Sequence, residues 1–171
     1  MVDWSLYAPI LIILLVAILG YFAIRRAIAS DGWYQQVVKS SLTPPNWIFG
    51  IVWFILYGLI AYVWVTANIS LENTNDFALL NWLFTIHIIL NLAWSFLFFG
   101  DGNIVAGFIV ILLMIITLLP LIYLVRANIW SVVILIIYLL WLIYALFLSW
   151  YIMANNTIIR CGDPGYPSLT W

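Results

Sequence analysis

Residues 103–125 read NIVAGFIVILLMIITLLPLIYLV, and this stretch decides what kind of protein the chain is. It contains no Asp, Glu, Lys or Arg, and it exceeds the roughly 20 apolar residues that a helix needs to cross a bilayer. A strand of a membrane β-barrel would instead show about 10 residues of alternating hydrophobicity. The stretch therefore predicts a transmembrane helix, whose backbone groups satisfy one another without water.

Four more apolar runs occupy most of the remaining chain. Cutting the sequence at its charges, Gly/Pro clusters and Asn runs places them at about residues 6–24, 47–67, 77–99 and 129–153. The last three of the five runs are separated by only a few residues, which makes those helices antiparallel neighbours. We therefore expect one domain over residues 1–171, an all-α integral membrane protein built as a bundle of five transmembrane helices.

The composition excludes several classes of protein. Of 171 residues 68% are hydrophobic and 6% are charged, whereas an ordinary soluble domain has roughly 25% charged residues. The net charge of −1 offers no basic face, so we expect membrane lipid and no nucleic acid as a partner. The single cysteine, Cys161, can form no disulfide within its own chain. No cluster of residues suggests a metal site, and we expect no obligatory cofactor.

Ionisable residues are missing from the predicted spans, apart from His87. Ion-coupled transporters usually place such residues at membrane depth, so their absence weighs against ion-driven pumping. The sequence also has no paired carboxylates, no nucleophile with a base, and no glycine loop for phosphate. Conventional hydrolytic chemistry therefore has no residues to carry it.

The basic residues between the spans predict an orientation. One side of the membrane receives Arg25, Arg26, Lys39 and Arg160, whereas the other side receives only Arg126. By the positive-inside rule, the N-terminus lies outside and the C-terminus is cytoplasmic. The sequence does not distinguish a bacterial inner membrane or cell envelope from a mitochondrial outer membrane.

Three polar residues share one face of the third span. His87, Asn91 and Ser95 are spaced i, i+4, i+8, and polar side chains in a span are expected to face the bundle interior. They can form a hydrogen-bonded seam between helices, or the polar wall of an internal pocket. A single histidine could also ligate one axial position of a haem iron.

The 11 tryptophans fall into two groups. Those near span ends fit an interfacial belt, whereas Trp53, Trp94 and Trp141 lie deeper and need a partner or a ligand for the indole N–H. Tyr57 shares the stripe of Trp53, and Ala145 leaves room beside Trp141. A cavity lined by flat aromatic rings suits a large, flat, hydrophobic ligand, and ordinary close packing of the interior is the alternative.

The first loop, residues 27–46, is too long for a simple connector. It contains Trp33, Tyr34 and the stiff pair Pro44–Pro45. A loop of this kind can fold back as a lid over a pocket that opens on the same side, and its aromatic residues argue against the alternative of a flexible hydrophilic loop.

Four segments together resemble the tryptophan-rich sensory protein family, whose eukaryotic members are the mitochondrial translocator proteins, or peripheral benzodiazepine receptors. They are WYQQVVKSSLTPPNW at 33–47, VWFILYG at 52–58, LNLAWSFLFFG at 90–100 and YLLWLIYA at 138–145. The match covers residues from about 30 to 155 in register. The sequence departs from the family at Ser40 and Ile51, where proline is usual. It also has no basic residue between Tyr151 and Arg160, which weakens the sterol-recognition pattern.

The resemblance implies a five-helix homodimer that binds porphyrins such as protoporphyrin IX or haem, and in some members a sterol, cholesterol. It implies a sensor, carrier or scavenger. The alternatives are light-dependent porphyrin degradation, with Trp53 and Trp141 as reacting residues, and transport of a tetrapyrrole or sterol. The resemblance, together with the polar face of the third span and the first loop, gives an expected set of ligand-binding residues. The set is Trp33, Tyr34, Pro44, Trp53, Tyr57, His87, Asn91, Trp94, Ser95, Trp141 and Ala145.

Overall fold

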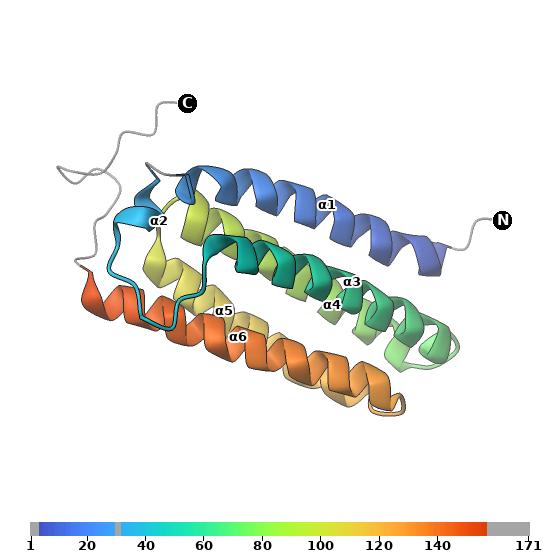
Figure 1. Cartoon of the computed structure of the whole chain (residues 1–171). Helices are drawn as coiled ribbons and strands as arrows, with labels where there is room; N and C mark the ends of the chain where they lie inside the picture. The colour runs from blue at the N-terminus through green and yellow to red at the C-terminus, as the bar shows by residue number, and fades with distance from the viewer. Residues whose placement is uncertain (1–3, 30–31, 157–171) are drawn as a thin grey trace.

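A computed structural model of the chain describes residues 4–29 and 32–156, and it is all-helical in this part. Five long helices are apolar enough to cross a membrane, which confirms the predicted fold class (Figure 1). They are α1 (Trp4–Ala27), α3 (Asn46–Leu71), α4 (Asp76–Trp94) with its continuation η1 (Ser95–Gly100), α5 (Ile104–Leu124) and α6 (Ile129–Asn155). Arg160 and Cys161 lie outside the described residues.

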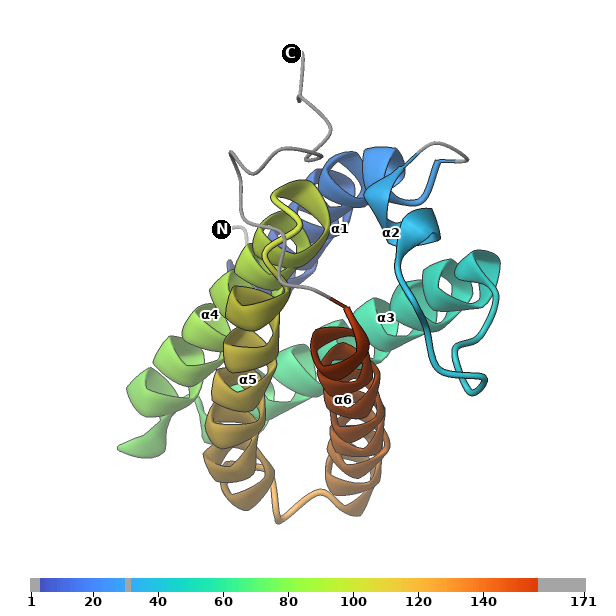
Figure 2. The ribbon, with the colours of Figure 1, turned by 90° about the vertical axis from the view of Figure 1, so that its left-hand side faces the viewer.

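The long helices alternate in direction, so the connections gather at the two ends of the bundle. The turns at 72–75 and 125–128 lie at the end where α1 begins (Figure 1). The first loop, with the short helix α2 (Trp33–Gln36), and the turn at 101–103 lie at the opposite end. Viewed along the bundle, α4, α5 and α6 form neighbouring pairs, while α1 packs on α3 and η1 (Figure 2).

Helix α3 continues past the span expected from hydropathy. The polar residues Thr66 and Ser70 do not break it, because each hydroxyl donates to the carbonyl four residues earlier in the same helix, Tyr62 O at 2.7 Å and Thr66 O at 2.9 Å. The helix therefore carries hydroxyl groups to its very end, where they meet the turn between α5 and α6.

Two asparagines set the starts of the last two helices. Asn103 Oδ1 accepts from Ala106 N at 3.0 Å, and Asn128 Oδ1 accepts from the backbone N–H groups of Trp130 and Ser131 at 3.0 and 3.3 Å. Before α5, Gly102 adopts a φ of 64°, which is accessible to glycine at little cost. Short, capped turns of this kind hold α4, α5 and α6 in antiparallel contact.

The bundle is apolar inside and outside. Its interior includes Leu80, Met114 and Leu135, which are completely buried. The outer surface exposes large apolar side chains such as Leu11, Phe54 and Ile116. A soluble monomer rarely exposes so continuous an apolar surface, whereas lipid tails cover one at no cost.

Candidate ligand-binding cavity

A cavity of about 550 Å³ lies between α1, α3 and the junction of α4 with η1. Pockets that bind drug-sized ligands range from about 300 to 1,000 Å³. We call it the aromatic cavity. Its lining comprises Ala17, Gly20, Tyr21, Ile24, Ile28, Tyr34, Asn46, Trp47, Phe49, Gly50, Trp53, Phe54, Tyr57, Trp94, Ser95 and Phe99.

Three aromatic rings form the inner wall of the aromatic cavity. The ring centroid of Trp53 lies 5.7 Å from that of Trp94 and 5.5 Å from that of Tyr57, with interplanar angles of 37° and 35°. Tilted rings at these distances make favourable aromatic contacts. Trp94 is buried, and its Nε1–H has no hydrogen-bond partner within the described part of the chain. An unpaired buried donor is costly, so this wall has an unmet hydrogen bond.

A small residue brings α1 close to the other side of the aromatic cavity. A Cβ atom built on Gly20 would lie 3.4 Å from Ser95 Oγ and 4.0 Å from the Tyr57 hydroxyl. These are ordinary van der Waals distances, so at Gly20 the helix α1 lies within one methyl group of η1 and α3. Because α1 comes this close to Ser95 and Tyr57, it forms one wall of the cavity.

The π-helical turn η1 contributes Ser95 and Phe99 to the lining of the aromatic cavity. Such turns are rare and concentrate at functional sites, because they reorient side chains and free backbone groups. Phe98 of η1 stacks on Trp94 with centroids 5.7 Å apart, and it packs directly on Gly107 of α5. A Cβ atom on Gly107 would lie 2.6 Å from Phe98 Cδ2, so the glycine makes room for this ring.

The first loop covers the aromatic cavity through α2. Trp33 Nε1 donates to the Phe99 carbonyl of η1 at 2.9 Å, which fixes the start of the loop on the bundle. Tyr34 lines the cavity, is only 3% exposed, and packs its ring 5.3 Å from that of Phe99. Tyr34 therefore covers this end of the cavity, and Trp33 attaches the loop to η1 from outside the lining.

A positively charged side chain, that of Lys39, lies beside Tyr34. Lys39 Nζ donates to the Tyr34 carbonyl at 2.8 Å and lies 4.7 Å from the centre of the Tyr34 ring. Partial burial lowers the pKa of Lys39. Burial, with a smaller contribution from Tyr144, raises the pKa of Tyr34 to about 12, so its phenol is neutral at physiological pH.

The far part of the first loop is fastened to α6. The Tyr144 hydroxyl donates to the Leu42 carbonyl at 2.6 Å. Asn156 pairs with both backbone groups of Val38, at 2.8 and 3.0 Å. The loop therefore spans from α1 to α6 across one end of the bundle (Figure 2). Its action as a lid stays a prediction.

Behind the aromatic cavity lies a directional chain of hydrogen bonds. Thr117 Oγ1 donates to the Met114 carbonyl at 3.0 Å, so it must accept from His87 Nδ1, 2.8 Å away. The proton on Nδ1 leaves Nε2 as an acceptor, and Nε2 receives the Tyr138 hydroxyl at 2.9 Å. This tautomer is assigned from the network and uses both nitrogens of the neutral ring.

The same chain continues to the wall of the cavity. Tyr138 accepts from Asn91 Nδ2 at 3.5 Å, and Asn91 Oδ1 accepts from the Tyr57 hydroxyl at 2.7 Å. We call the set the polar seam, consisting of Tyr57, Asn91, Tyr138, His87 and Thr117. It joins α3, α4, α5 and α6, which is the arrangement expected of polar groups between membrane helices.

The structure brings part of the expected ligand-binding set together. Tyr34, Trp53, Tyr57, Trp94 and Ser95 line the aromatic cavity. Trp33 and Asn91 lie one layer behind the lining. Trp33 is hydrogen-bonded to the lining residue Phe99, and Asn91 to the lining residue Tyr57. His87 is buried in the polar seam and would have to give up a hydrogen bond to ligate a metal.

The remaining expected residues lie outside this lining. Trp141 of α6 packs on Phe49 with ring centroids 5.8 Å apart, and Phe49 itself lines the cavity. Trp141 Nε1 is buried without a hydrogen-bond partner within the described residues. Ala145 is buried on the same helix, and Pro44 lies in the first loop. Trp141 is therefore the second tryptophan with an unmet hydrogen bond, separated from the cavity by one ring.

Sequence reasoning did not identify the wall that α1 contributes. This helix is apolar on all sides, so its periodicity marks no inward face. The one signal was Gly20, the single glycine of the first span. Sequence reasoning also did not identify Phe99 as a lining residue, because its position depends on the π-helical turn.

Comparison with known proteins agrees with this architecture. The family model described as TspO/MBR matches residues 9–154. The chain is 36% identical over 155 residues to "Tryptophan-rich protein TspO" of Archaeoglobus fulgidus, covering 89% of this chain and 97% of the relative. It is 35% identical to the Bacillus cereus protein of the same name, covering 72% and 80% of the two chains.

A human protein is also similar over part of the chain. "Translocator protein" of Homo sapiens is 34% identical over 85 residues, which is 48% of this chain and 50% of the human one. These matches confirm the resemblance inferred from the four motifs. The chain is a multi-pass integral membrane protein and belongs to the TspO/MBR family.

Proposed function

We propose that the chain binds a flat, hydrophobic tetrapyrrole, of the kind represented by protoporphyrin IX, in the aromatic cavity. The observation that carries the proposal is the wall of Trp53, Tyr57 and Trp94 with the unpaired Trp94 Nε1–H. Flat rings at the wall supply stacking area, and the N–H supplies one directional donor. A sensor, a carrier and a scavenger would all use such a site.

The chemistry of the lining favours a macrocycle held by its faces. Among the described residues that line the cavity there is no His, Cys or Met, and His87 is committed to the polar seam, so tyrosine is the only type of haem ligand in the lining. A metal-free porphyrin needs no such ligand and is held by its faces alone. The acidic side chains of a porphyrin would lie toward Tyr34, where Lys39 supplies the nearby positive charge.

Tryptophan fluorescence tests the proposal. Titration of the purified protein with protoporphyrin IX should give saturable quenching, and Trp94→Phe should weaken the affinity by about five- to tenfold, because it removes a donor and part of the wall. Trp82→Phe is the matched control, since Trp82 is exposed and lies near the opposite end of the bundle. Unchanged affinity in Trp94→Phe would reject the aromatic cavity as the site.

The position of Trp141 makes a second variant informative. Trp141→Phe removes an indole that packs behind Phe49, outside the lining. We expect a smaller change of affinity than for Trp94→Phe. A larger one would show that the ligand reaches α6 and that Phe49 moves to admit it.

Light-dependent degradation of the porphyrin is the second candidate function. The contact between Trp53 and Trp94 favours it, because two indoles 5.7 Å apart would both lie beside a bound macrocycle and could exchange an electron with its excited state. Illumination in air should then bleach the porphyrin faster in the protein than in empty micelles, and Trp53→Phe should slow the reaction. Equal bleaching in protein and micelles would reject this activity.

A further inference from the structure

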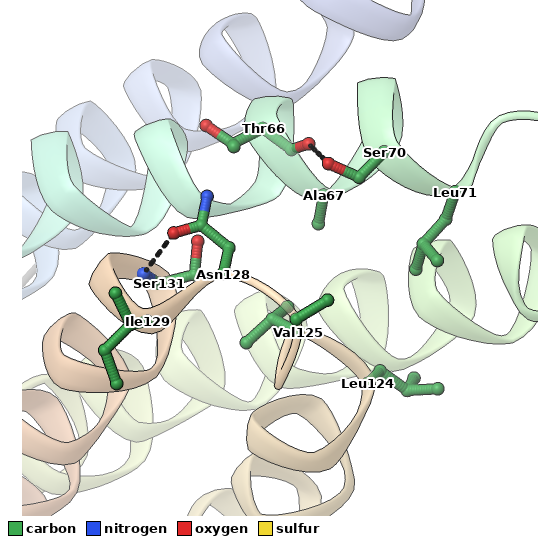
Figure 3. A pocket seen from close by; sticks show the side chains of 10 residues that line it. Thr66, Ala67, Ser70, Leu71, Leu124, Val125, Asn128, Ile129 and Ser131 are labelled. Atoms are coloured by element: carbon green, nitrogen blue, oxygen red, sulfur yellow. Dashed lines mark hydrogen bonds between the residues drawn. The ribbon is translucent and has the colours of Figure 1, made fainter.

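A second cavity, of about 380 Å³, lies at the opposite end of the bundle from the first loop. It is bounded by the end of α3 on one side and by the α5–α6 turn and the start of α6 on the other (Figure 3). We call it the turn cavity. The volume exceeds what a few water molecules fill, at about 30 Å³ each, and it falls within the range of ligand pockets.

One side chain of the turn cavity has an unmet hydrogen bond. Ser131 is 1% exposed, and its Oγ has no hydrogen-bond partner within the described part of the chain. A hydroxyl that is buried without a partner normally costs stability. In Figure 3 Ser131 points toward α3, into the space between the two walls.

The other polar groups complement this hydroxyl. The Oδ1 atom of Asn128 caps α6, and its Nδ2 group donates to nothing in the described part of the chain. The hydroxyls of Thr66 and Ser70 donate to carbonyls of α3, so their oxygens remain available to accept. The cavity thus offers donors from the side of α6 and acceptors from the side of α3.

The polar but uncharged lining of the turn cavity favours a neutral ligand. Among the described residues, none of those that line the turn cavity is ionisable. Arg126 of the adjoining turn is held on Tyr123, where it donates to the carbonyl and lies over the ring. A charged head group would therefore find no counter-charge in the lining itself. A group that both donates and accepts hydrogen bonds matches the two walls. Hydroxyl groups do this, and a head with several hydroxyls can reach both sides at once.

The position of the turn cavity identifies the source of such a head. Trp82 and Trp130 are both 68% exposed near this end of the bundle, as expected for tryptophans at the membrane–water interface. The apolar part of the lining, with Leu71, Leu124 and Ile129, continues the lipid-facing surface. A molecule with its head in the cavity and its chain along the helices would come from the bilayer itself.

We propose that the turn cavity binds the neutral, hydroxyl-bearing head of a glycerolipid from the surrounding membrane. Ser131 and Asn128 donate to it, Thr66 and Ser70 accept from it, and the apolar residues contact the start of its acyl chain. The site is separate from the aromatic cavity and does not depend on what binds there.

Photo-crosslinking tests this site directly. The full chain in phosphatidylcholine nanodiscs is illuminated with a monoacylglycerol that carries a diazirine and an alkyne in its acyl chain, and adducts are mapped by peptide mass spectrometry. We expect saturable labelling of residues 66–71 and 124–131, displaced by unlabelled monoacylglycerol. Labelling spread evenly over the lipid-facing helices would overturn the proposal.

Two competitors separate the alternatives. A fatty acid of the same chain length, ionised at pH 8, should compete at least tenfold more weakly, because its head is anionic. Equal competition would overturn the selection of a neutral head. Protoporphyrin IX should not displace the probe, and displacement would show that the two cavities are not separate sites. Failure of porphyrin binding would leave the result for the glycerolipid unaffected.

Substitution of Ser131 gives the sharpest test. Ser131→Ala should weaken monoacylglycerol binding roughly fivefold, as expected for one lost hydrogen bond. Without the lipid it should keep or raise the melting temperature, since the hydroxyl that it removes has no partner. Unchanged affinity, or a lower melting temperature without lipid, would contradict the proposal.

Two further variants complete the design. Ser149→Ala is the matched control, because Ser149 is buried on the same helix but lines neither cavity, so monoacylglycerol affinity should not change. Ala67→Leu extends a lining side chain into the turn cavity and should abolish saturable labelling. Labelling that persists in Ala67→Leu would place the lipid elsewhere.

Discussion

The Tyr57 hydroxyl donates a 2.7 Å hydrogen bond to Asn91 Oδ1, and Tyr57 is the one residue that both lines the aromatic cavity and belongs to the polar seam. Through this bond the wall of the cavity is coupled to His87 and to α5. A substitution of Tyr57 should therefore affect helix packing and the cavity together, whereas substitutions of seam residues outside the lining should affect mainly the packing.

Tyr57→Phe should destabilise the protein by about 1–3 kcal/mol, because it leaves Asn91 Oδ1 buried without this donor. Thermal melting in detergent measures the loss. In the double variant Tyr57→Phe/Asn91→Leu the two losses should be less than additive, as for any pair in contact. Strict additivity would contradict a direct bond.

His87→Leu should be more destabilising, by about 2–4 kcal/mol, because it removes the partners of two hydroxyls, those of Tyr138 and Thr117. The variant's melting temperature should fall, and the near-ultraviolet circular dichroism of the protein should change. Because His87 lies outside the cavity lining, protein that remains folded should still bind protoporphyrin IX. Loss of binding in folded His87→Leu would argue that the histidine contacts the ligand.

Gly107→Ala should destabilise the bundle by about 1–3 kcal/mol, since the added methyl group collides with the Phe98 ring. The displaced ring stacks on Trp94, so the emission spectrum of the tryptophans should shift as well. Gly58→Ala is the control, because a Cβ there meets no atom within 4 Å. Equal melting temperatures for the two variants would contradict the close packing at Gly107.

Alkaline pH should loosen the cover of the aromatic cavity. The pKa of Tyr34 rises from 10.0 to about 12 on folding, so the unfolded chain loses this proton first as the pH increases. The stabilisation is complete below pH 10 and is lost between pH 10 and 12, by up to about 2–3 kcal/mol. Melting temperatures over this range should fall less steeply in Tyr34→Phe than in the wild type, and parallel curves would refute the assignment.

The fold was predictable because hydrocarbon imposes a simple rule. Any long apolar run must become a helix, and five such runs, of which the last three have short connections, favour a bundle with antiparallel neighbours. The π-helical turn at Ser95–Gly100 was not predictable, since nothing in SFLFFG distinguishes it from a continued α-helix. Its effect is to place Phe98 and Phe99 beneath the cover.

The candidate site was predictable only where polarity or aromatic character marked a face. Spacing grouped Trp53 with Tyr57 and identified the face of Asn91 and Ser95, all of which lie at or directly behind the aromatic cavity. It placed Trp141 on an inward face but could not tell which partner that face meets. The orientation in the membrane and the homodimer also stay predictions, because both depend on surroundings that one chain does not contain.

Helix α1 closes the aromatic cavity by packing on α2, α3, α4 and η1. In lipid no hydrophobic force holds such a helix to its neighbours, since hydrocarbon solvates it equally well. The contents of the cavity therefore contribute to the association of α1 with the bundle, and the thickness and lateral pressure of the bilayer enter the same equilibrium. Ligand affinity then depends on the membrane as well as on the protein. A dissociation constant measured in detergent should therefore differ from the values measured in bilayers of different thickness.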